Sequence, residues 1–494
     1  MPSTPNLTPS WLDAIINSHT HFDHIHSVLA ARESKRERAR SATRHSYNSS
    51  RRRRSLIGSS IVAISRQPPR EVLEHFSVET GSKEENLKLN RYYAIEPFDR
   101  TRVLVGGSST ESCRSKDENE KAGKAAGVEE DGRYLNANWV RELHGGKWWV
   151  ATQAPLPNTA HTFLSLFLQS QTRPPRKLSG MKHDNGNAGS GSGSSSGAGA
   201  STDPNAPWEG PCRLRTAVQL TLMNEGGRPK AHQYFPTEIG QSYIIPPHSH
   251  HAHTHTHTHT HARSCHSRSH DRAIKITLEE QITHSHASAV QSTLRLVYCQ
   301  DPPGEPDERR WSRAEEVGTP VRVTHLLFSS WPDFGIPEGP EEKAALLSFA
   351  RLVEKVNREI PPEEHLLHPP YNAHAHAYKS HPNPPIVVNC SAGVGRTGSF
   401  IAINSLLRSH GLLLPVYPPS SLSDFPPLHS SPLGPLPEDV AMDKVATEVD
   451  SLREQRTSMV QKSEQMMLVY ELLAAAYHEK HERQERKRRE NCDE

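Results

Sequence analysis

The clearest shortage in this sequence is of apolar side chains. Only 34% of its 494 residues are hydrophobic and 6% are aromatic. The length is enough for two or three ordinary domains, but such a composition cannot supply a core for every residue. The sequence therefore predicts one folded domain that carries long solvated insertions.

The sequence also lacks an excess of charge of one sign. It contains 58 Lys and Arg residues against 56 Asp and Glu, a net charge of +2, so no overall field attracts nucleic acid. The basic residues gather near the N-terminus, with four consecutive arginines at positions 51–54. Such a run is typical of a nuclear import signal, a contact for an acidic partner or a kinase recognition site, and a solvated arm explains it equally well. We expect no nucleic-acid partner.

Long apolar runs and paired cysteines are missing as well. No run approaches the ~18 apolar residues of a membrane span, and the N-terminus shows no basic region followed by an apolar one, which a secretory signal requires. The six cysteines, at positions 113, 212, 265, 299, 390 and 492, have no paired spacing. Reduced thiols are therefore expected. The predicted location is the cytoplasm, or the nucleus if residues 51–54 act as an import signal.

What the sequence does contain is a strand–turn–helix pattern around one cysteine. Residues 386–388 are β-branched and apolar, which predicts a buried strand. Residues 400–407 carry apolar side chains at spacings of three and four, which predicts a helix, and Gly411 stands where that helix should end.

The turn between strand and helix carries Cys390 and Arg396, separated by five residues. Gly393 and Gly395 allow the backbone to direct its N–H groups inward, and the helix N-terminus adds partial positive charge. The pattern predicts a socket for a tetrahedral dianion, with a sulfur beneath it and a guanidinium that clamps it. A thiol ionises more readily in such surroundings, so Cys390 is predicted to be a nucleophile that attacks phosphorus.

The string CSAGVGRTG at residues 390–398 resembles the signature loop of the protein tyrosine phosphatases. The resemblance implies that Cys390 forms a cysteinyl phosphate, that Arg396 holds two phosphate oxygens and that Thr397 assists the departing sulfur. It also implies that the loop interior contacts the phosphate, through Ser391, Ala392, Gly393, Val394 and Gly395. The string contains G-x-G-x-x-G too, but no second strand with an acidic residue follows, so we discount a dinucleotide site.

Two further blocks that resemble this family supply substrate contacts. The block at residues 90–103 carries Tyr92, which would stack on the substrate ring. The block at residues 225–236 carries Glu225, which would pair with Arg396, and Lys230, which would lie near a mobile acid loop. Blocks at residues 134–138 and 149–159 resemble structural motifs of the same domain.

The acid loop and the last block complete the implied chemistry. The string WPDFG at residues 331–335 places Trp331 as a loop anchor and Asp333 as the acid that protonates the leaving tyrosine. Asp333 would then act as the base on a water molecule positioned by Gln461, with Gln465 four residues further on. The implied mechanism needs no metal or cofactor, and the implied partners are phosphotyrosine-containing proteins acted on by a monomer.

Three positions depart from the family pattern. Ala94 stands where Asp or Asn is usual, Asn389 where His is usual and Lys462 where Thr is usual. These departures leave open a catalytically weak scaffold that binds phosphotyrosine. A dual-specificity phosphatase stays open as the alternative enzyme.

The resemblance implies an α/β fold, a twisted mixed sheet flanked by helices, over residues 66–480. Low-complexity insertions are expected near residues 106–131, 171–210, 246–270, 361–384 and 415–437. Residues 1–65 should form a helix over 11–31 and then a basic disordered arm, and residues 481–494 a charged tail.

One motif near the N-terminus points elsewhere. His19, His21, Asp23 and His24 resemble the metal motif of the metallo-β-lactamase fold. A charged stretch follows them at once and histidines abound in this chain, so a chance match is the better interpretation.

Overall fold

The structure is a computed structural model that describes residues 8–52, 68–106, 132–169, 212–247, 272–300, 314–332, 335–360, 381–416 and 430–491. The five expected insertions lie wholly or mostly outside these ranges, and so does Asp333.

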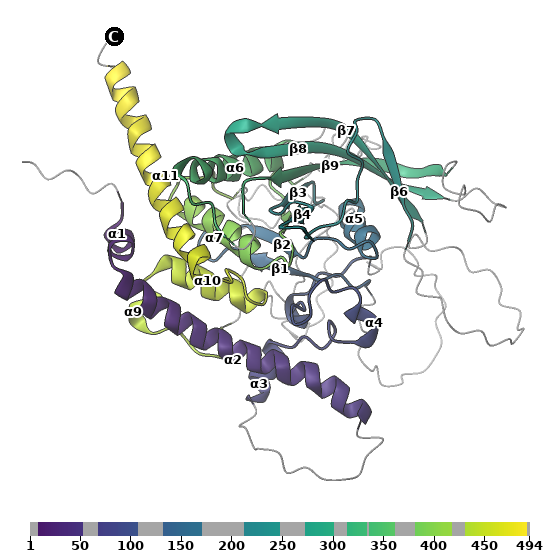
Figure 1. The fold of residues 1–494 in the computed structure, drawn as a ribbon, viewed down its shortest axis with the longest axis horizontal. Helices are drawn as coiled ribbons and strands as arrows, with labels where there is room; N and C mark the ends of the chain where they lie inside the picture. Colours follow the sequence, from purple (N-terminus) through teal and green to yellow (C-terminus); the bar gives the residue numbers. More distant parts are fainter. Residues whose placement is uncertain are drawn as a thin grey trace, which may run out of the picture.

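Eight strands form one mixed sheet in the order β1-β2-β10-β3-β9-β8-β7-β6 (Figure 1). They are β1 (Ala137–Arg141), β2 (Trp148–Thr152), β3 (Thr216–Gln219), β6 (Ser242–Ile245), β7 (Ala273–His284), β8 (Ala289–Gln300), β9 (Glu315–Phe328) and β10 (Ile386–Asn389). β10 pairs in parallel with β2 and β3, and β3 pairs in parallel with β9. All four residues of β10 are buried, as its continuous apolar run predicts for a central parallel strand. A separate ribbon contains β4 (Asn224–Glu225) and β5 (Arg228–Pro229).

Helices flank this sheet, so the expected α/β fold is confirmed. The longer ones are α1 (Ser10–Asn17), α2 (His19–Arg52), α5 (Ala160–Leu168), α6 (Pro340–Arg358), α7 (Gly395–Ser409), α10 (Lys444–Gln455) and α11 (Ser463–Glu490). Short helices are α3 (Arg70–His75), α4 (Glu84–Leu87), α9 (Glu438–Ala441) and the 3₁₀ turns η1 (Asp99–Thr101) and η4 (Ser285–Ala287). Among the described residues, no helix combines the length and the apolarity that crossing a bilayer requires.

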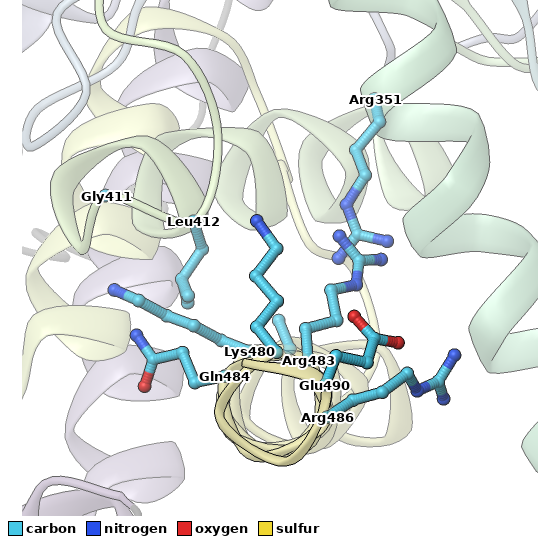
Figure 2. Close-up of a pocket in the computed structure, with 10 residues that line it drawn as sticks. Arg351, Gly411, Leu412, Lys480, Arg483, Gln484, Arg486 and Glu490 are labelled. Carbon is cyan, nitrogen blue, oxygen red and sulfur yellow. The ribbon is translucent and has the colours of Figure 1, made fainter. Parts of the chain in front are cut away.

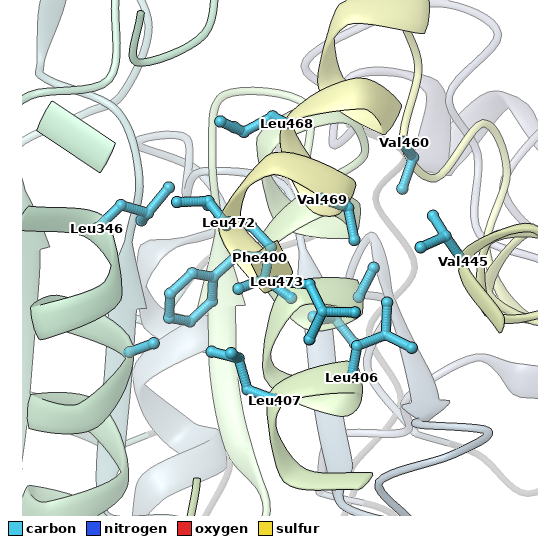
Figure 3. Close-up of a cluster of buried hydrophobic side chains, with 14 of the residues drawn as sticks. Leu346, Phe400, Leu406, Leu407, Val445, Val460, Leu468, Val469, Leu472 and Leu473 are labelled. Carbon is cyan, nitrogen blue, oxygen red and sulfur yellow. The ribbon is translucent and has the colours of Figure 1, made fainter. Parts of the chain in front are cut away.

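The helix α7, which follows the cysteine turn, is packed on several sides. Its Phe400, Leu406 and Leu407 are buried against side chains of α6, α10 and α11, among them Leu346, Val445, Leu468, Val469, Leu472 and Leu473 (Figure 3). Full burial of one such side chain contributes roughly 1.5–3 kcal/mol. The cluster therefore holds the helix, and with it the turn that precedes it, in a fixed position.

The N-terminal region differs from the prediction. We expected a helix over residues 11–31 and a disordered arm beyond it, whereas α2 continues to Arg52. The reason is a set of four arginines one helical turn apart, all buried against the rest of the domain: Arg32, Arg36, Arg40 and Arg44. Figure 1 shows α2 beside α3 and α10. Residues 53–65 of the expected arm lie outside the described ranges.

Three of the four buried arginines of α2 pair with carboxylates from distant segments, whereas Arg40 pairs with Glu33 and Glu37 of α2 itself. Arg36 Nη2 lies 2.6 Å from Asp450 Oδ1 and 2.5 Å from Glu454 Oε1. Arg32 Nε donates to Asp450 Oδ1 at 3.0 Å, and its other nitrogens donate to backbone oxygens of residues 433–435. The end of an expected insertion is thus part of the packed domain, because its carbonyl groups accept hydrogen bonds from α2.

We predict that Arg36→Met lowers the free energy of unfolding by roughly 3–5 kcal/mol, because Asp450 and Glu454 lose a buried cationic partner. Urea denaturation of both proteins measures the difference. Arg70→Met is the matched control, since Arg70 pairs with Glu74 in solvent and its loss should change little. Equal effects of the two substitutions would contradict a structural role for the α2 arginines.

Candidate functional site

The signature loop (residues 390–396) leaves the central strand β10 and leads into α7. Gly393 has a φ of +72°, and a Cβ there would lie 2.1 Å from the Thr152 carbonyl oxygen, so no other residue fits. Its N–H donates to Cys390 Sγ at 3.3 Å. Cys390 is buried. The turn therefore brings at least one backbone donor to the sulfur, as the sequence predicted.

Arg396 is held in one plane by Glu225. Its Nη1 and Nη2 donate to the two carboxylate oxygens at 2.7 and 2.8 Å, and Nη1 also donates to the Leu220 carbonyl at 3.0 Å. Glu225 accepts further bonds from Thr221 Oγ1 and from the Leu222 N–H. Burial acts to raise the pKa of Glu225, but the hydrogen bonds and charge of Arg396 outweigh it and lower this pKa. A bidentate pair of this kind fixes the orientation of the guanidinium.

Two buried polar side chains, Asn389 and Thr397, lie at either end of the signature loop in the sequence. Asn389 is buried, and its Nδ2 donates to the Cys390 carbonyl oxygen at 3.2 Å. Thr397 is also buried, and its Oγ1 has no hydrogen-bond partner among the described residues. Buried hydroxyl groups without a partner are rare, so Thr397 is an unusual feature of this part of the structure.

Tyr92 reaches the signature loop from the segment at residues 90–96. Its hydroxyl oxygen lies 2.7 Å from Ser391 Oγ, and Ser391 Oγ donates to the Lys230 carbonyl oxygen at 2.7 Å. The residue Tyr92 is 37% exposed, so part of it stays accessible beside the loop. The structure thus brings Tyr92, Ser391 and the backbone of Lys230 together.

The acid-loop segment is described only at its ends. Trp331 is buried against Phe328, and its Nε1 donates to the Gly335 carbonyl oxygen at 3.2 Å. This bond joins the two ends of the segment, as an anchor should. Asp333 lies between them, outside the described residues.

The two glutamines near the start of α11 have different surroundings. Gln465 is buried, and its Oε1 accepts the N–H groups of Gln461 and Lys462 at 3.0 and 3.3 Å. A Cβ on Gly395 would lie 2.9 Å from the Gln465 amide, so Gln465 packs directly on the signature loop. Gln461 is exposed and lines a cavity of about 310 Å³ beside α2.

Sequence reasoning missed Arg456, which lies beneath the signature loop. It is fully buried, and it donates to the carbonyl oxygens of Gly393 and Ala392 at 2.8 and 3.1 Å. It also donates to Asn138 Oδ1 at 2.7 Å and Asn136 Oδ1 at 3.0 Å. Burial lowers the pKa of Arg456 to about 10, so it stays charged at neutral pH. A single arginine at the end of a helix gives no signal of such a role in the sequence.

Another cavity, of about 460 Å³, lies near the C-terminal end of α11, where Arg351, Lys480 and Arg483 are among its lining residues (Figure 2). It contains none of the predicted site residues. The candidate site is therefore the signature loop and the segments that contact it.

Comparisons with known proteins agree with this location. The family described as "Protein-tyrosine phosphatase" matches residues 86–173 and 264–411. The "Tyrosine-protein phosphatase Lar-like" of Caenorhabditis elegans is 23% identical over 338 residues, which are 68% of this chain and 9% of that protein. The mouse (Mus musculus) "Receptor-type tyrosine-protein phosphatase eta" is 24% identical over 328 residues, 66% of this chain and 16% of that protein. This chain thus spans less than a fifth of the length of these relatives.

The matched residues include the Tyr92 segment, the acid-loop segment and the whole signature loop. The "Receptor-type tyrosine-protein phosphatase C" of Rattus norvegicus is 38% identical over a shorter stretch of 95 residues, 19% of this chain and 6% of that protein. With these matches and the mixed sheet that carries the loop, the chain belongs to the protein-tyrosine phosphatase family.

Proposed function

We propose that this chain hydrolyses phosphotyrosine in proteins through a cysteinyl-phosphate intermediate. One observation carries the proposal: a buried cysteine faces an inward backbone N–H in the same loop whose arginine is held bidentately by Glu225. That combination of a thiol, backbone donors and an oriented guanidinium suits a tetrahedral dianion. Membership of the phosphatase family supports the same activity.

In the first step, the Cys390 thiolate attacks phosphorus in line with the tyrosyl oxygen. Arg396 and the loop amides stabilise the charge on the equatorial oxygens. The bond between phosphorus and the tyrosyl oxygen breaks, and Asp333 gives its proton to that oxygen.

In the second step, Gln461 positions a water molecule, Asp333 accepts a proton from it, and the water oxygen attacks phosphorus. The phosphorus–sulfur bond breaks, and Thr397 donates a hydrogen bond to the departing sulfur. The buried Thr397 hydroxyl without a described partner supports this assignment. Gln465, packed on Gly395, is proposed to hold the start of α11 against the loop.

The substrate class follows from the side chains around the loop. The half-exposed Tyr92 ring beside Ser391 favours an aromatic phosphate ester, and the loop interior, residues 391–395, contains no lysine for a more highly charged substrate. Dual specificity and a weak phosphotyrosine-binding scaffold stay as alternatives. We further propose a cytoplasmic location, or a nuclear one through residues 51–54, because the cysteines show no paired spacing. Hydrolysis of phosphotyrosine in proteins would give the chain a role in signal transduction.

We predict that Cys390→Ser lowers kcat for p-nitrophenyl phosphate by more than about a thousandfold, roughly 4 kcal/mol of barrier, because a serine hydroxyl is a far weaker nucleophile. Binding of a phosphotyrosine peptide should persist. Cys299→Ala is the matched control, since this free buried thiol lies on β8 and its loss should leave turnover intact. A Cys390→Ser protein with near-normal kcat would rule out the cysteinyl intermediate, and an inactive unsubstituted chain that binds the peptide would favour the scaffold.

We predict that Asp333→Ala slows the hydrolysis of phosphotyrosine strongly, because tyrosine is a poor leaving group without a proton. An aryl phosphate with an acidic phenol should be less affected. The ratio of kcat values for the two substrates in both proteins is the measurement. If both substrates lose the same factor, Asp333 is not the proton donor.

We predict that Glu225→Gln lowers kcat/KM by about tenfold to a hundredfold, or roughly 1.4–2.7 kcal/mol, because Arg396 loses the charged half of its bidentate partner. Thermal unfolding of the same protein separates this effect from misfolding. Glu279→Gln is the control, because Glu279 pairs with Arg322 on the partly exposed sheet. Unchanged kinetics in Glu225→Gln would show that the plane of Arg396 needs no carboxylate.

A further inference from the structure

The arginines of α2 lie over aromatic rings of the segment that carries Tyr92. The guanidinium carbon of Arg36 lies 5.8 Å from the Phe76 ring centroid, that of Arg40 6.0 Å from Phe98, and that of Arg44 5.5 Å from Tyr93. Phe76 and Phe98 also pack on one another. Cation–ring contacts of this kind are attractive. Helix α2 therefore contacts Tyr93 within the recognition loop, residues 90–96, and two rings outside that loop, Phe76 and Phe98.

The strongest contact between α2 and the recognition loop is the pair Arg44–Glu96. Arg44 Nε and Nη2 donate to the two Glu96 oxygens, each at 2.8 Å. The two side chains are only 7% and 1% exposed. Glu96 is packed so closely on Gly81 that a Cβ there would lie 2.7 Å from the Glu96 Cβ. A buried carboxylate requires such a partner, so Glu96 can occupy this place only while Arg44 meets it.

Between the two residues that Arg44 holds lies a strained position. Ala94 has a φ of +71°, a conformation that residues with a Cβ disfavour and that Asn and Asp tolerate better. Such strain persists only where the surroundings enforce it. Arg44 binds Tyr93 on one side of Ala94 and Glu96 on the other, so it supplies that enforcement.

We propose that Arg44 is a positioning residue for substrate binding. By binding Tyr93 and Glu96, it keeps the strained recognition loop in the conformation that holds Tyr92 against Ser391. The N-terminal helix thereby sets the affinity for phosphotyrosine peptides without touching the phosphate. Tyr93 is 75% exposed and contacts Arg44 through its ring. The inference rests on the proposed function for its substrate and on the described contacts for its mechanism.

The test compares Arg44→Ala with the unsubstituted chain on two ligands. The KM for a phosphotyrosine peptide should rise about tenfold, equivalent to about 1.4 kcal/mol, with kcat little changed. The inhibition constant of vanadate, a small oxyanion that needs only the signature loop, should stay the same. A rise in both values, or in neither, would overturn the proposal.

Two further variants exclude a general loss of structure. Arg32→Ala removes a buried arginine from the same helix, but its partners are Asp450 and the carbonyls of residues 433–435, so it should lower the melting temperature without raising KM. Arg44→Lys keeps the charge but cannot bind both Glu96 oxygens, so its KM should be intermediate. Equal KM values in Arg32→Ala and Arg44→Ala would assign the effect to docking of the whole helix.

A substitution at Ala94 tests the role of the backbone strain. Ala94→Gly relieves the positive φ, so the effect of Arg44→Ala on KM should be smaller in an Ala94→Gly background. If the unsubstituted chain hydrolyses no phosphotyrosine, the proposed function fails. In that case, hydrogen exchange of amides 91–96 still tests whether Arg44 holds the recognition loop in place. Faster exchange in Arg44→Ala than in Arg32→Ala supports this role of Arg44, and equal rates overturn it.

Discussion

The structure of this site depends on the hydrogen bonds that Arg456 makes beneath the signature loop. When a tight loop turns its N–H groups toward a common centre, its carbonyl groups must point away from that centre. Here Arg456 donates to the carbonyls of Ala392 and Gly393, and the second of these bonds is buried. Buried carbonyl groups without donors would oppose this backbone conformation. The N–H of Gly393 that donates to Cys390 Sγ and the carbonyl of Gly393 that accepts from Arg456 therefore depend on the same backbone conformation.

The same arginine joins the signature loop to the recognition loop. Arg456 binds Asn136 Oδ1, while Asn136 Nδ2 donates to Asn90 Oδ1 at 2.9 Å and to the Ile95 carbonyl at 2.6 Å. Asn136 thus stands between the phosphate socket and both ends of the segment that carries Tyr92. A chain of short, buried hydrogen bonds transmits position well because neither end can shift without leaving a polar group unpaired. This chain of hydrogen bonds, and not the sheet alone, sets the distance between Cys390 and Tyr92.

The sequence predicted the structure correctly where the residues that determine it are neighbours in the chain. The strand, the turn and the helix around Cys390 follow from a run of β-branched residues, two glycines and a helical repeat, and the structure confirms β10, α7 and the positive φ of Gly411. It did not predict the burial of charged residues whose partners of opposite charge are distant in the sequence. Arg36 and Arg44 resemble solvated side chains in a charged stretch, because nothing near them in the sequence reveals that their carboxylates are Asp450, Glu454 and Glu96. The surroundings of the two glutamines were also hidden: the structure buries Gln465 against Gly395 and leaves Gln461 exposed.

Helix α2 therefore behaves as part of the catalytic domain and not as an appendage. One part of it pairs with Asp450 and Glu454 on α10, the helix that leads directly to Arg456, and another pairs with Glu96 in the recognition loop. A continuous helix of 34 residues is about 50 Å long and stiff, so it resists independent movement of the two segments that it binds. Detaching it would break the ion pairs of its arginines with Asp450, Glu454 and Glu96, and also the ring contacts with Phe76, Phe98 and Tyr93. Because these losses would occur together, α2 stays docked or leaves as a unit, and the loop around Ala94 keeps its strained shape only in the docked state.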